Sequence, residues 1–269
     1  MTMKREEWKS FFDSQIESLD LAKLNVTALD SIITKPFKSE DLHGLIQFNP
    51  SRAISSLAKL DAATISIRKC FLCEDNRPHQ QKSYEILPGW DLLVNPYPIL
   101  KYHFTISCRK HVPQSLDINT GCELAKQLEG LVVFFHADGA GASAPDHLHY
   151  QAVPIESLPL IKLLDEDRTN ETALELPFRI MRKKDELEAS NSPLNVYFWV
   201  NQNKQIKILA IPRKNHRPNE YFLNPPERIA VSPGAIDMAG VIVVPIEEDY
   251  HKINDEIMAG IYNQVSFRG

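Results

Sequence analysis

Two histidines and a glutamine alternate along one short segment, His147-Leu148-His149-Tyr150-Gln151. This alternation predicts a short β-strand in which the two imidazoles and the carboxamide share one face, while Leu148 and Tyr150 point toward a core. A neutral imidazole can attack phosphorus, and the preceding segment Gly139-Ala140-Gly141-Ala142-Ser143 can offer backbone N–H groups to a phosphate. The pattern therefore favours a catalytic phosphate-handling site over the alternative of a strand whose polar face is only solvated.

A Cys-x-x-Cys motif, Cys70-Phe71-Leu72-Cys73, has the spacing that holds one face of a tetrahedral zinc ion. The motif alone is also compatible with redox chemistry or with two packed thiols. A zinc site needs two further ligands, for which His111 and His147 are the candidates. We expect a structural zinc, because four protein ligands leave no open position on the metal.

The cationic run Arg213-Lys214-Asn215-His216-Arg217 follows a predicted strand. Arginine binds phosphate through two parallel hydrogen bonds, so Arg213, Lys214 and Arg217 are candidates for a phosphate clamp. The alternative is a solvated loop.

Composition narrows the class of protein. The 269 residues are 43% hydrophobic, which is enough for one large domain or two small ones. The net charge of -5 argues against a general nucleic-acid binder, which is usually basic. The sequence contains neither an apolar run of about 20 residues nor a secretory signal, so we expect a cytoplasmic protein without a membrane partner.

Hydrophobic periodicity predicts a mixture of helices and strands. We expect an amphipathic helix over residues 5–24, a polar loop containing Pro36, and a domain boundary after an N-terminal helical segment at 1–44. The segment 103–111 echoes the segment 206–216, since each is a strand-like run followed by Arg-Lys and then a histidine. This echo predicts that the catalytic domain at 45–269 contains two related halves, at about 45–155 and 195–250, joined by helix and surface loop. The expected helices and strands of this domain lie at 84–87, 90–94, 103–107, 120–131, 132–135, 196–200, 206–211 and 241–244.

These motifs resemble the histidine triad superfamily, in the branch of galactose-1-phosphate uridylyltransferases, dinucleoside polyphosphate phosphorylases and GDP-L-galactose phosphorylases. The resemblance rests on the cysteine-bearing segment at 70–77, on Asn95-Pro96-Tyr97-Pro98 with the run 103–111, on Gly141-Ala142-Ser143 leading to His147-Leu148-His149-Tyr150-Gln151, and on the segment 232–240. It implies an α+β fold: an antiparallel sheet with flanking helices, histidine-triad-like, with two related halves.

The resemblance also implies roles for individual residues. His149 would be the nucleophile that forms a covalent nucleotidyl-histidine, Ser143 would contact the phosphates and Asn95 the ribose. Cys70, Cys73, His111 and His147 match the zinc ligands of some members. Gln151 stands where hydrolytic members usually carry a third histidine, and Leu148 stands where the uridylyltransferases usually carry proline.

We therefore expect a nucleotidyltransferase or phosphorylase that acts on a nucleoside diphosphate sugar or a dinucleoside polyphosphate. Phosphate or a sugar phosphate would be the acceptor, because Gln151 cannot act as a base for a neutral one. The alternatives are a nucleotide hydrolase, a non-catalytic nucleotide-binding protein and a zinc-stabilised interaction protein. The sequence does not determine the nucleobase, the sugar or the oligomeric state, and a homodimer is compatible with it.

Overall fold

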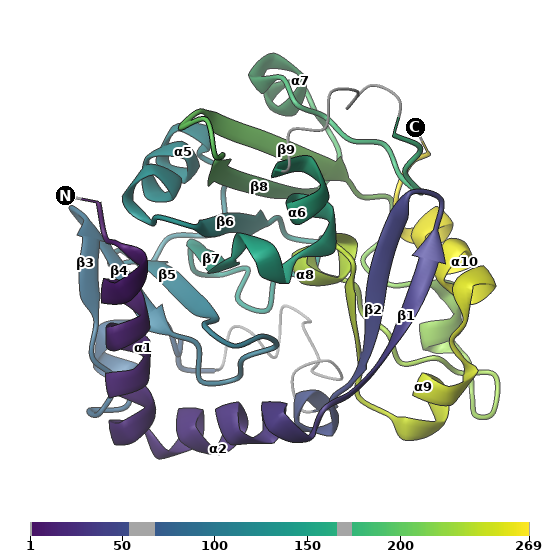
Figure 1. Ribbon diagram of the computed structural model, residues 1–269, viewed down its shortest axis with the longest axis horizontal. Coiled ribbons are helices and arrows are strands. Elements are labelled where there is room, and N and C mark those ends of the chain that lie inside the picture. Colours follow the sequence, from purple (N-terminus) through teal and green to yellow (C-terminus); the bar gives the residue numbers. More distant parts are fainter. Residues whose placement is uncertain (1, 54–67, 166–173, 269) are drawn as a thin grey trace.

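A seven-stranded antiparallel sheet forms the centre of the protein (Figure 1). The computed structural model describes residues 2–53, 68–165 and 174–268. The strand order is β3-β4-β5-β7-β6-β8-β9. The bounds of these strands are β3 Tyr84–Leu87, β4 Trp90–Val94, β5 Phe104–Cys108, β6 Leu131–His136, β7 His149–Pro154, β8 Leu194–Val200 and β9 Ile206–Pro212.

A smaller sheet of three strands lies beside the large one. Strands β1 (Ile33–Ser39) and β2 (Leu42–Phe48) form an antiparallel hairpin, and β10 (Val241–Val244) pairs with β2 in parallel. This hairpin corrects the expected helical segment at 1–44, because its helices end earlier and the proposed boundary falls inside β2. Pro36 is accommodated because β1 is an edge strand, where a missing N–H costs no sheet hydrogen bond.

Helices surround both sheets. The expected helix over 5–24 is two helices, α1 (Arg5–Ser18) and α2 (Asp20–Ala28), which meet at Leu19. The others are α5 Ile118–Gln127, α6 Pro159–Asp165, α7 Lys184–Glu188, α8 Ala235–Met238, α9 Glu247–Lys252 and α10 Asp255–Val265. Short 3-10 helices are η1 Leu29–Ser31, η2 Pro50–Arg52, η3 Glu74–Asn76, η4 Ile155–Ser157 and η6 Asn219–Phe222.

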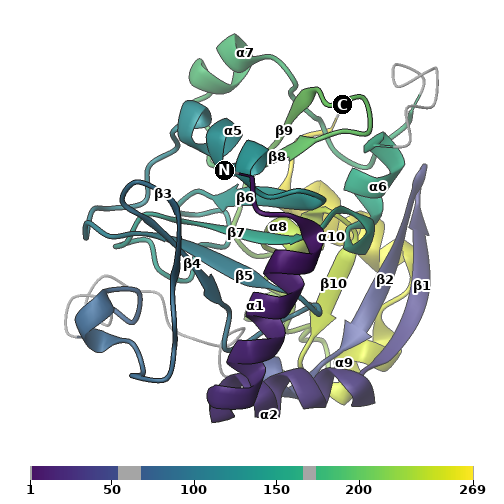
Figure 2. The ribbon, with the colours of Figure 1, turned by 60° about the vertical axis from the view of Figure 1, so that its left-hand side comes forward.

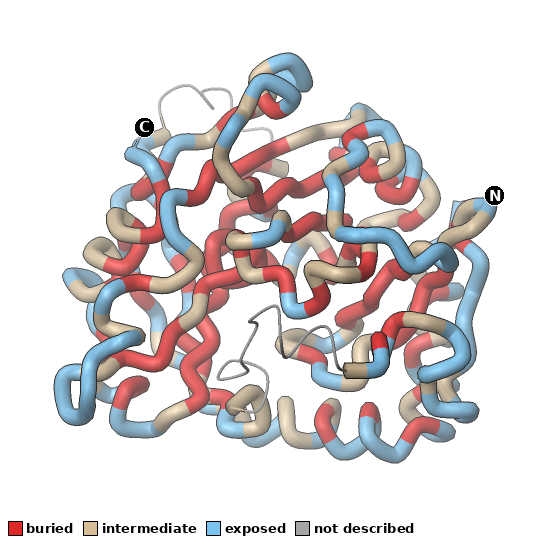
Figure 3. The backbone as a smooth tube through the Cα atoms, turned by 180° about the vertical axis from the view of Figure 1, so that it is seen from behind, coloured by how far each residue is buried: buried red, intermediate tan, exposed pale blue. Residues whose placement is uncertain are grey.

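The two faces of the large sheet pack against different layers, and its central strands are largely buried (Figures 2 and 3). One core joins the sheet to α1 and α5, and it contains Tyr150 and Ala152 of β7. The other core joins the sheet to the small sheet, α8 and α10, and it contains Val153. Since neighbouring residues of a strand point to opposite faces, His149 and Gln151 lie on the same face as Val153.

The predicted α+β class with antiparallel pairing and flanking helices is confirmed. The strands expected at 84–87, 90–94 and 241–244 have the observed bounds, and the other expected strands agree within a few residues. The segment 156–194 was expected to join the two halves as helix and surface loop. Part of it forms α6 and α7, and its residues 166–173 lie outside the described part of the chain. Within the described residues, none of the helices is long and apolar enough to cross a membrane.

Candidate active site and metal centre

His149 is the first residue of β7, and its ring is oriented by the backbone of His147. Its Nδ1 atom lies 2.8 Å from the carbonyl oxygen of His147, and this oxygen can only accept a hydrogen bond. The Nδ1 atom therefore carries the proton, and Nε2 keeps its lone pair. Burial lowers the pKa of His149 to about 4, so the ring is neutral at pH 7. A neutral imidazole with a free Nε2 lone pair has the form of a nucleophile.

Gln151 follows two residues later and is half-buried on the same face. Its Oε1 atom lies 2.7 Å from Nε2 of His103, the residue that precedes β5. The sequence analysis did not single out His103 as a site residue. Its only sequence signal was its place at the start of the alternating run 103–107.

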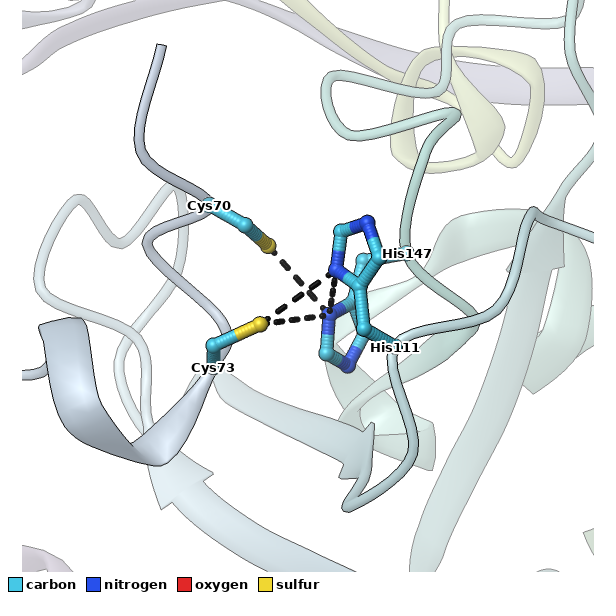
Figure 4. A group of neighbouring side chains, drawn as sticks. All are labelled: Cys70, Cys73, His111 and His147. Carbon is cyan, nitrogen blue, oxygen red and sulfur yellow. Dashed lines mark hydrogen bonds between the residues drawn. The ribbon is translucent and has the colours of Figure 1, made fainter.

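His147 departs from the predicted strand. It lies in the bend before β7 and not within the strand, so the three polar residues do not form one row. Its ring turns instead toward Cys70, Cys73 and His111 (Figure 4). The structure thus separates the two histidines of the motif. His147 joins the Cys/His cluster, whereas His149 faces α8 and the small sheet.

The four side chains of this cluster have the geometry of a metal centre. The Nδ1 atom of His147 lies 3.2 Å from Sγ of Cys70, 3.6 Å from Sγ of Cys73 and 3.2 Å from Nδ1 of His111. Sγ of Cys73 lies 3.3 Å from Nδ1 of His111. In a tetrahedral zinc site, ligand atoms about 2.0–2.3 Å from the metal are separated from one another by about 3.3–3.8 Å. The observed spacing is close to this range.

The tautomer of His147 suits metal binding as well. Its Nε2 atom lies 2.7 Å from the carbonyl oxygen of Cys108 and 3.1 Å from Oγ of Ser107. Since a carbonyl only accepts, Nε2 carries the proton and the Nδ1 lone pair points to the cluster. A backbone carbonyl at the second ring nitrogen is the usual support for a metal-bound histidine.

The glycine-rich loop between β6 and β7 is held against the segment that precedes α8. Gly141 has a φ of +95°, and a Cβ at this position would lie 2.7 Å from Cα of Gly234. The close approach therefore requires glycine at position 141. The loop is fixed from the sheet side by Asn195, whose Nδ2 atom donates to the carbonyl oxygen of Ala140 at 2.7 Å. Ser143 is exposed at the end of the loop.

His136, the last residue of β6, is a second site residue that sequence reasoning missed. The register that sets Phe134 opposite Gln151 brings His136 opposite His149. The backbone N–H of Ala235 donates to Nδ1 of His136 at 3.2 Å, so the neutral ring carries its proton on Nε2. That Nε2–H is buried and has no hydrogen-bond partner among the described residues. Burial lowers the pKa of His136 to about 3, which keeps the ring neutral.

Arg213 does not form the predicted clamp at the surface. Its side chain is 1% exposed, and its five N–H groups are all used. The acceptors are the carbonyl oxygens of Val265, Pro233, Asn215 and His216 and the side-chain oxygen of Asn195. No donor is left for a phosphate, so Arg213 joins β9 to α10, to the segment before α8 and, through Asn195, to the glycine-rich loop.

The other two basic residues of this run lie outside the core. Lys214 is exposed, and its ammonium group lies over the ring of Phe267. Arg217 donates from Nε to Oγ of Ser232 at 3.0 Å, which places it at the segment that precedes α8.

Asn95, the predicted ribose contact, follows β4. Its side-chain oxygen accepts a hydrogen bond from the backbone N–H of Tyr97 at 2.9 Å, and its backbone N–H donates to the carbonyl oxygen of His103.

Two further arginines lie near the site. Arg68 pairs with Asp146 at 2.5 Å, and the two charges oppose each other at His149, because the carboxylate raises its pKa and the guanidinium lowers it. Arg52 lies in η2 and is half-buried, and its positive charge lowers the pKa of His103. The only sequence signal for Arg68 was its position two residues before Cys70.

Comparison with solved structures supports the architecture. The chain is similar to yeast Ap4A phosphorylase Apa2 in complex with Ap4A, with 15% identity, a TM-score of 0.58, and coverage of 93% of this chain and 97% of that one. The same yeast protein gives a TM-score of 0.57 at 14% identity in a second structure, over 93% and 97% of the two chains. In complex with AMP, it gives 0.54 at 15% identity, over 95% and 97%. These similarities confirm the predicted α+β fold.

Sequence comparison with curated proteins gives no significant match. A family model does match residues 11–154, a segment that begins in α1 and ends with β7, and so contains the metal cluster, the glycine-rich loop, His149 and Gln151. This match spans more than half of the chain, and the protein therefore belongs to the family described as a domain of unknown function, DUF4922.

Proposed function

We propose that this protein is a nucleotidyltransferase of the phosphorylase type, which acts on a dinucleoside polyphosphate or a nucleoside diphosphate sugar through a covalent nucleotidyl-His149. One observation carries the proposal: His149 is neutral, and its Nδ1–H donates to the backbone oxygen of His147, so its Nε2 lone pair is available. The similarity in fold to a yeast phosphorylase that binds Ap4A and AMP supports a nucleotide substrate.

The first step is attack of His149 Nε2 on the α-phosphorus of the nucleotide. A P–N bond forms while the P–O bond to the leaving group breaks, and the leaving group takes the electron pair. Because a sugar phosphate or a nucleoside polyphosphate leaves as an anion, this step needs no proton donor. In the second step an oxygen of the acceptor attacks the same phosphorus, and the P–N bond breaks to return neutral His149.

Hydrogen-bond donors surround the position of the reacting phosphoryl group. Gln151 and His136 lie on the same face of the sheet as His149, and each carries a hydrogen-bond donor without a partner among the described residues. Donors fixed in a buried site stabilise the negative charge that develops on the non-bridging oxygens.

The acceptor is proposed to be phosphate or a sugar phosphate. Gln151 cannot remove a proton from water, whereas an ionised phosphate oxygen needs no base. The neutral rings of His103 and His136 both carry their proton on Nε2, so neither offers a base there at pH 7.

Zinc is proposed to be bound by Cys70, Cys73, His111 and His147. The spacing of their ligand atoms and the tautomer of His147 support this assignment. When bound, zinc would fix His147 and the loop around it and would take no part in the chemistry, because four protein ligands complete its coordination.

Covalent labelling tests the nucleotidyl-histidine. The protein is mixed with Ap4A or with a nucleoside diphosphate sugar that carries ³²P at the α-phosphorus, and is then quenched in alkali, because phosphoramidates are labile in acid. We expect stoichiometric labelling of the wild type, accompanied by a burst of the leaving group, and no labelling of His149→Ala. His43→Ala, which alters an exposed histidine on β2, is the matched control and should be labelled like the wild type.

The products identify the acceptor. With phosphate, a phosphorylase converts the labelled protein to a nucleoside diphosphate with ping-pong kinetics. If turnover is the same with and without phosphate or a sugar phosphate, and only the nucleoside monophosphate appears, the protein is a hydrolase. An unlabelled wild type that nevertheless binds nucleotide contradicts the enzymatic proposal.

A further inference from the structure

His103 lies between the loop that precedes β5 and the carboxamide of Gln151. The backbone N–H of Ile99 donates to Nδ1 of His103 at 3.2 Å, so the neutral ring must carry its proton on Nε2. The Nε2 atom lies 2.7 Å from the atom assigned as Oε1 in the carboxamide of Gln151. Since a donor requires an acceptor, the carbonyl oxygen of the carboxamide, and not its amino group, faces His103.

The register of the sheet gives the direction of the amino group. Thr105 pairs with Gln151, and Ser107 pairs with His149. His103, two residues before Thr105, therefore approaches Gln151 from the side away from His149. The oxygen and the amino group occupy the two sides of a carboxamide, so fixing the oxygen toward His103 places the amino group on the side of His149. This amino group has no partner among the described residues, so its donors remain available.

The environment of His103 preserves this arrangement. Its side chain is 1% exposed, and burial lowers the pKa of His103 to about 3, assisted by the positive charge of Arg52. The ring therefore stays neutral throughout the physiological pH range, with one nitrogen accepting and the other donating. A buried ring with both nitrogens satisfied has little freedom to turn.

We propose that His103 is a positioning residue, which fixes the Gln151 carboxamide so that its amino group faces the phosphoryl group at His149. This inference rests on the proposed function. A carboxamide in the opposite orientation would present lone pairs to the phosphoryl oxygens and would repel them. The carboxamide thus offers donors to the side of the site next to His149, which suits the transfer of a phosphoryl group between two partners that are already anionic.

A double-mutant cycle tests whether His103 acts through Gln151. His103→Phe keeps a ring but loses the donor, and Gln151→Leu keeps the approximate shape but loses the carboxamide. We expect each single change to slow single-turnover labelling of His149 by about 10–100-fold, with a much smaller effect on nucleotide binding. The double variant should be no slower than Gln151→Leu alone. If the two effects multiply instead, His103 acts independently of Gln151, and the proposal is overturned.

The matched control is His43→Phe, the same substitution at an exposed position on β2, which should leave labelling unchanged. Thermal unfolding of each variant separates lost stability from lost positioning, because His103→Phe also deprives the Ile99 N–H of its acceptor. A readout that does not depend on activity is ¹⁵N NMR of the wild type. Protonation of His103 at Nε2 supports the assignment, and protonation at Nδ1 overturns it even if His103→Phe does not fold.

Binding of AMP separates the failure of this inference from the failure of the proposed function. If the wild type binds AMP but is not labelled by the α-³²P substrates, nucleotidyl transfer is refuted. The positioning of Gln151 is then judged by the side-chain amide resonances of Gln151. A shift on AMP binding that is present in the wild type and lost in His103→Phe supports the role of His103, and equal shifts in both proteins refute it.

Discussion

The Nδ1 atom of His149 lies 2.8 Å from the backbone carbonyl oxygen of His147, a residue whose side chain belongs to the metal cluster. His147 thus faces the Cys/His cluster through its ring and orients His149, the proposed nucleophile, through its backbone. Because this hydrogen bond directly connects the backbone of His147 to the ring of His149, a displacement of His147 by a fraction of an ångström would change the direction of the Nε2 lone pair of His149. The stability of the metal centre and the rate of transfer are therefore expected to be linked.

Removal of one zinc ligand tests this link. We expect one zinc ion per chain in the wild type, measured by elemental analysis of protein purified without chelator. Cys73→Ser should lose the metal, unfold at a clearly lower temperature, and be labelled about tenfold more slowly, because metal binding is coupled to folding and orients neighbouring groups. Cys122→Ser, which lies in α5 outside the cluster, should keep both zinc and rate. A wild type without zinc would contradict the metal assignment.

His136 is expected to bind the substrate through its unpaired Nε2–H. A buried donor without a protein partner is rare, and an anionic oxygen of the substrate would satisfy it. A hydrogen bond to a charged group contributes about 1.5–3 kcal/mol, so His136→Phe should weaken binding of AMP or GMP by about 10–100-fold in calorimetry. His43→Phe is the matched control on an exposed strand position. Unchanged affinity of His136→Phe would show that this donor does not contact the nucleotide.

Arg213 is expected to act on stability and loop geometry, and not as a phosphate clamp. Arg213→Met would leave three buried and two partly buried acceptors without their donor, including Asn195, which holds the glycine-rich loop. We expect a loss of at least about 3 kcal/mol in the free energy of unfolding, measured by urea denaturation. Lys214→Met alters the neighbouring exposed cation and should change stability by less than about 0.5 kcal/mol. Similar stabilities for the two variants would contradict this role.

Acid should destabilise the protein below about pH 6.5. Burial lowers the pKa of His103 and His136 to about 3 and that of His216 to about 4, from an ordinary value of 6.5. As the pH falls, the unfolded chain binds protons at these residues before the folded chain does, so the free energy of unfolding decreases between about pH 6.5 and 4. Asp237 acts in the opposite direction below about pH 6, because burial raises its pKa to about 6 from 3.8.

Urea unfolding between pH 7 and 4.5 measures this dependence. His216→Gln removes one of the buried rings and should make the decrease less steep by up to about 1.4 kcal/mol per pH unit. Comparison of this variant with the wild type cancels any contribution from metal release, which both proteins share. Identical slopes for the two proteins would contradict the assignment of a neutral buried His216.

Features of the site that depend only on residues close together in the sequence could be predicted from it. Strict alternation put His149 and Gln151 on one face of β7, and the two-residue spacing of Cys70 and Cys73 predicted two members of the Cys/His cluster that the structure brings together. The same local patterns gave the strands of the large sheet close to their observed bounds. Pro36 was the main local error, because whether proline is tolerated depends on the strand being at an edge, which is decided by its pairing.

The remaining side chains of the site come from strands that are distant in sequence, so they became visible only in the tertiary structure. His103 and Gln151 are brought together by the pairing of β5 with β7, and His136 reaches His149 through the pairing of β6 with β7. The basic run at 213–217 looked like a surface clamp, yet Arg213 is buried among acceptors from α10, β8 and the segment before α8. Hydrophobic periodicity reports only the immediate neighbours along the chain, whereas burial, tautomer and hydrogen-bond partners depend on contacts between residues that are distant in sequence.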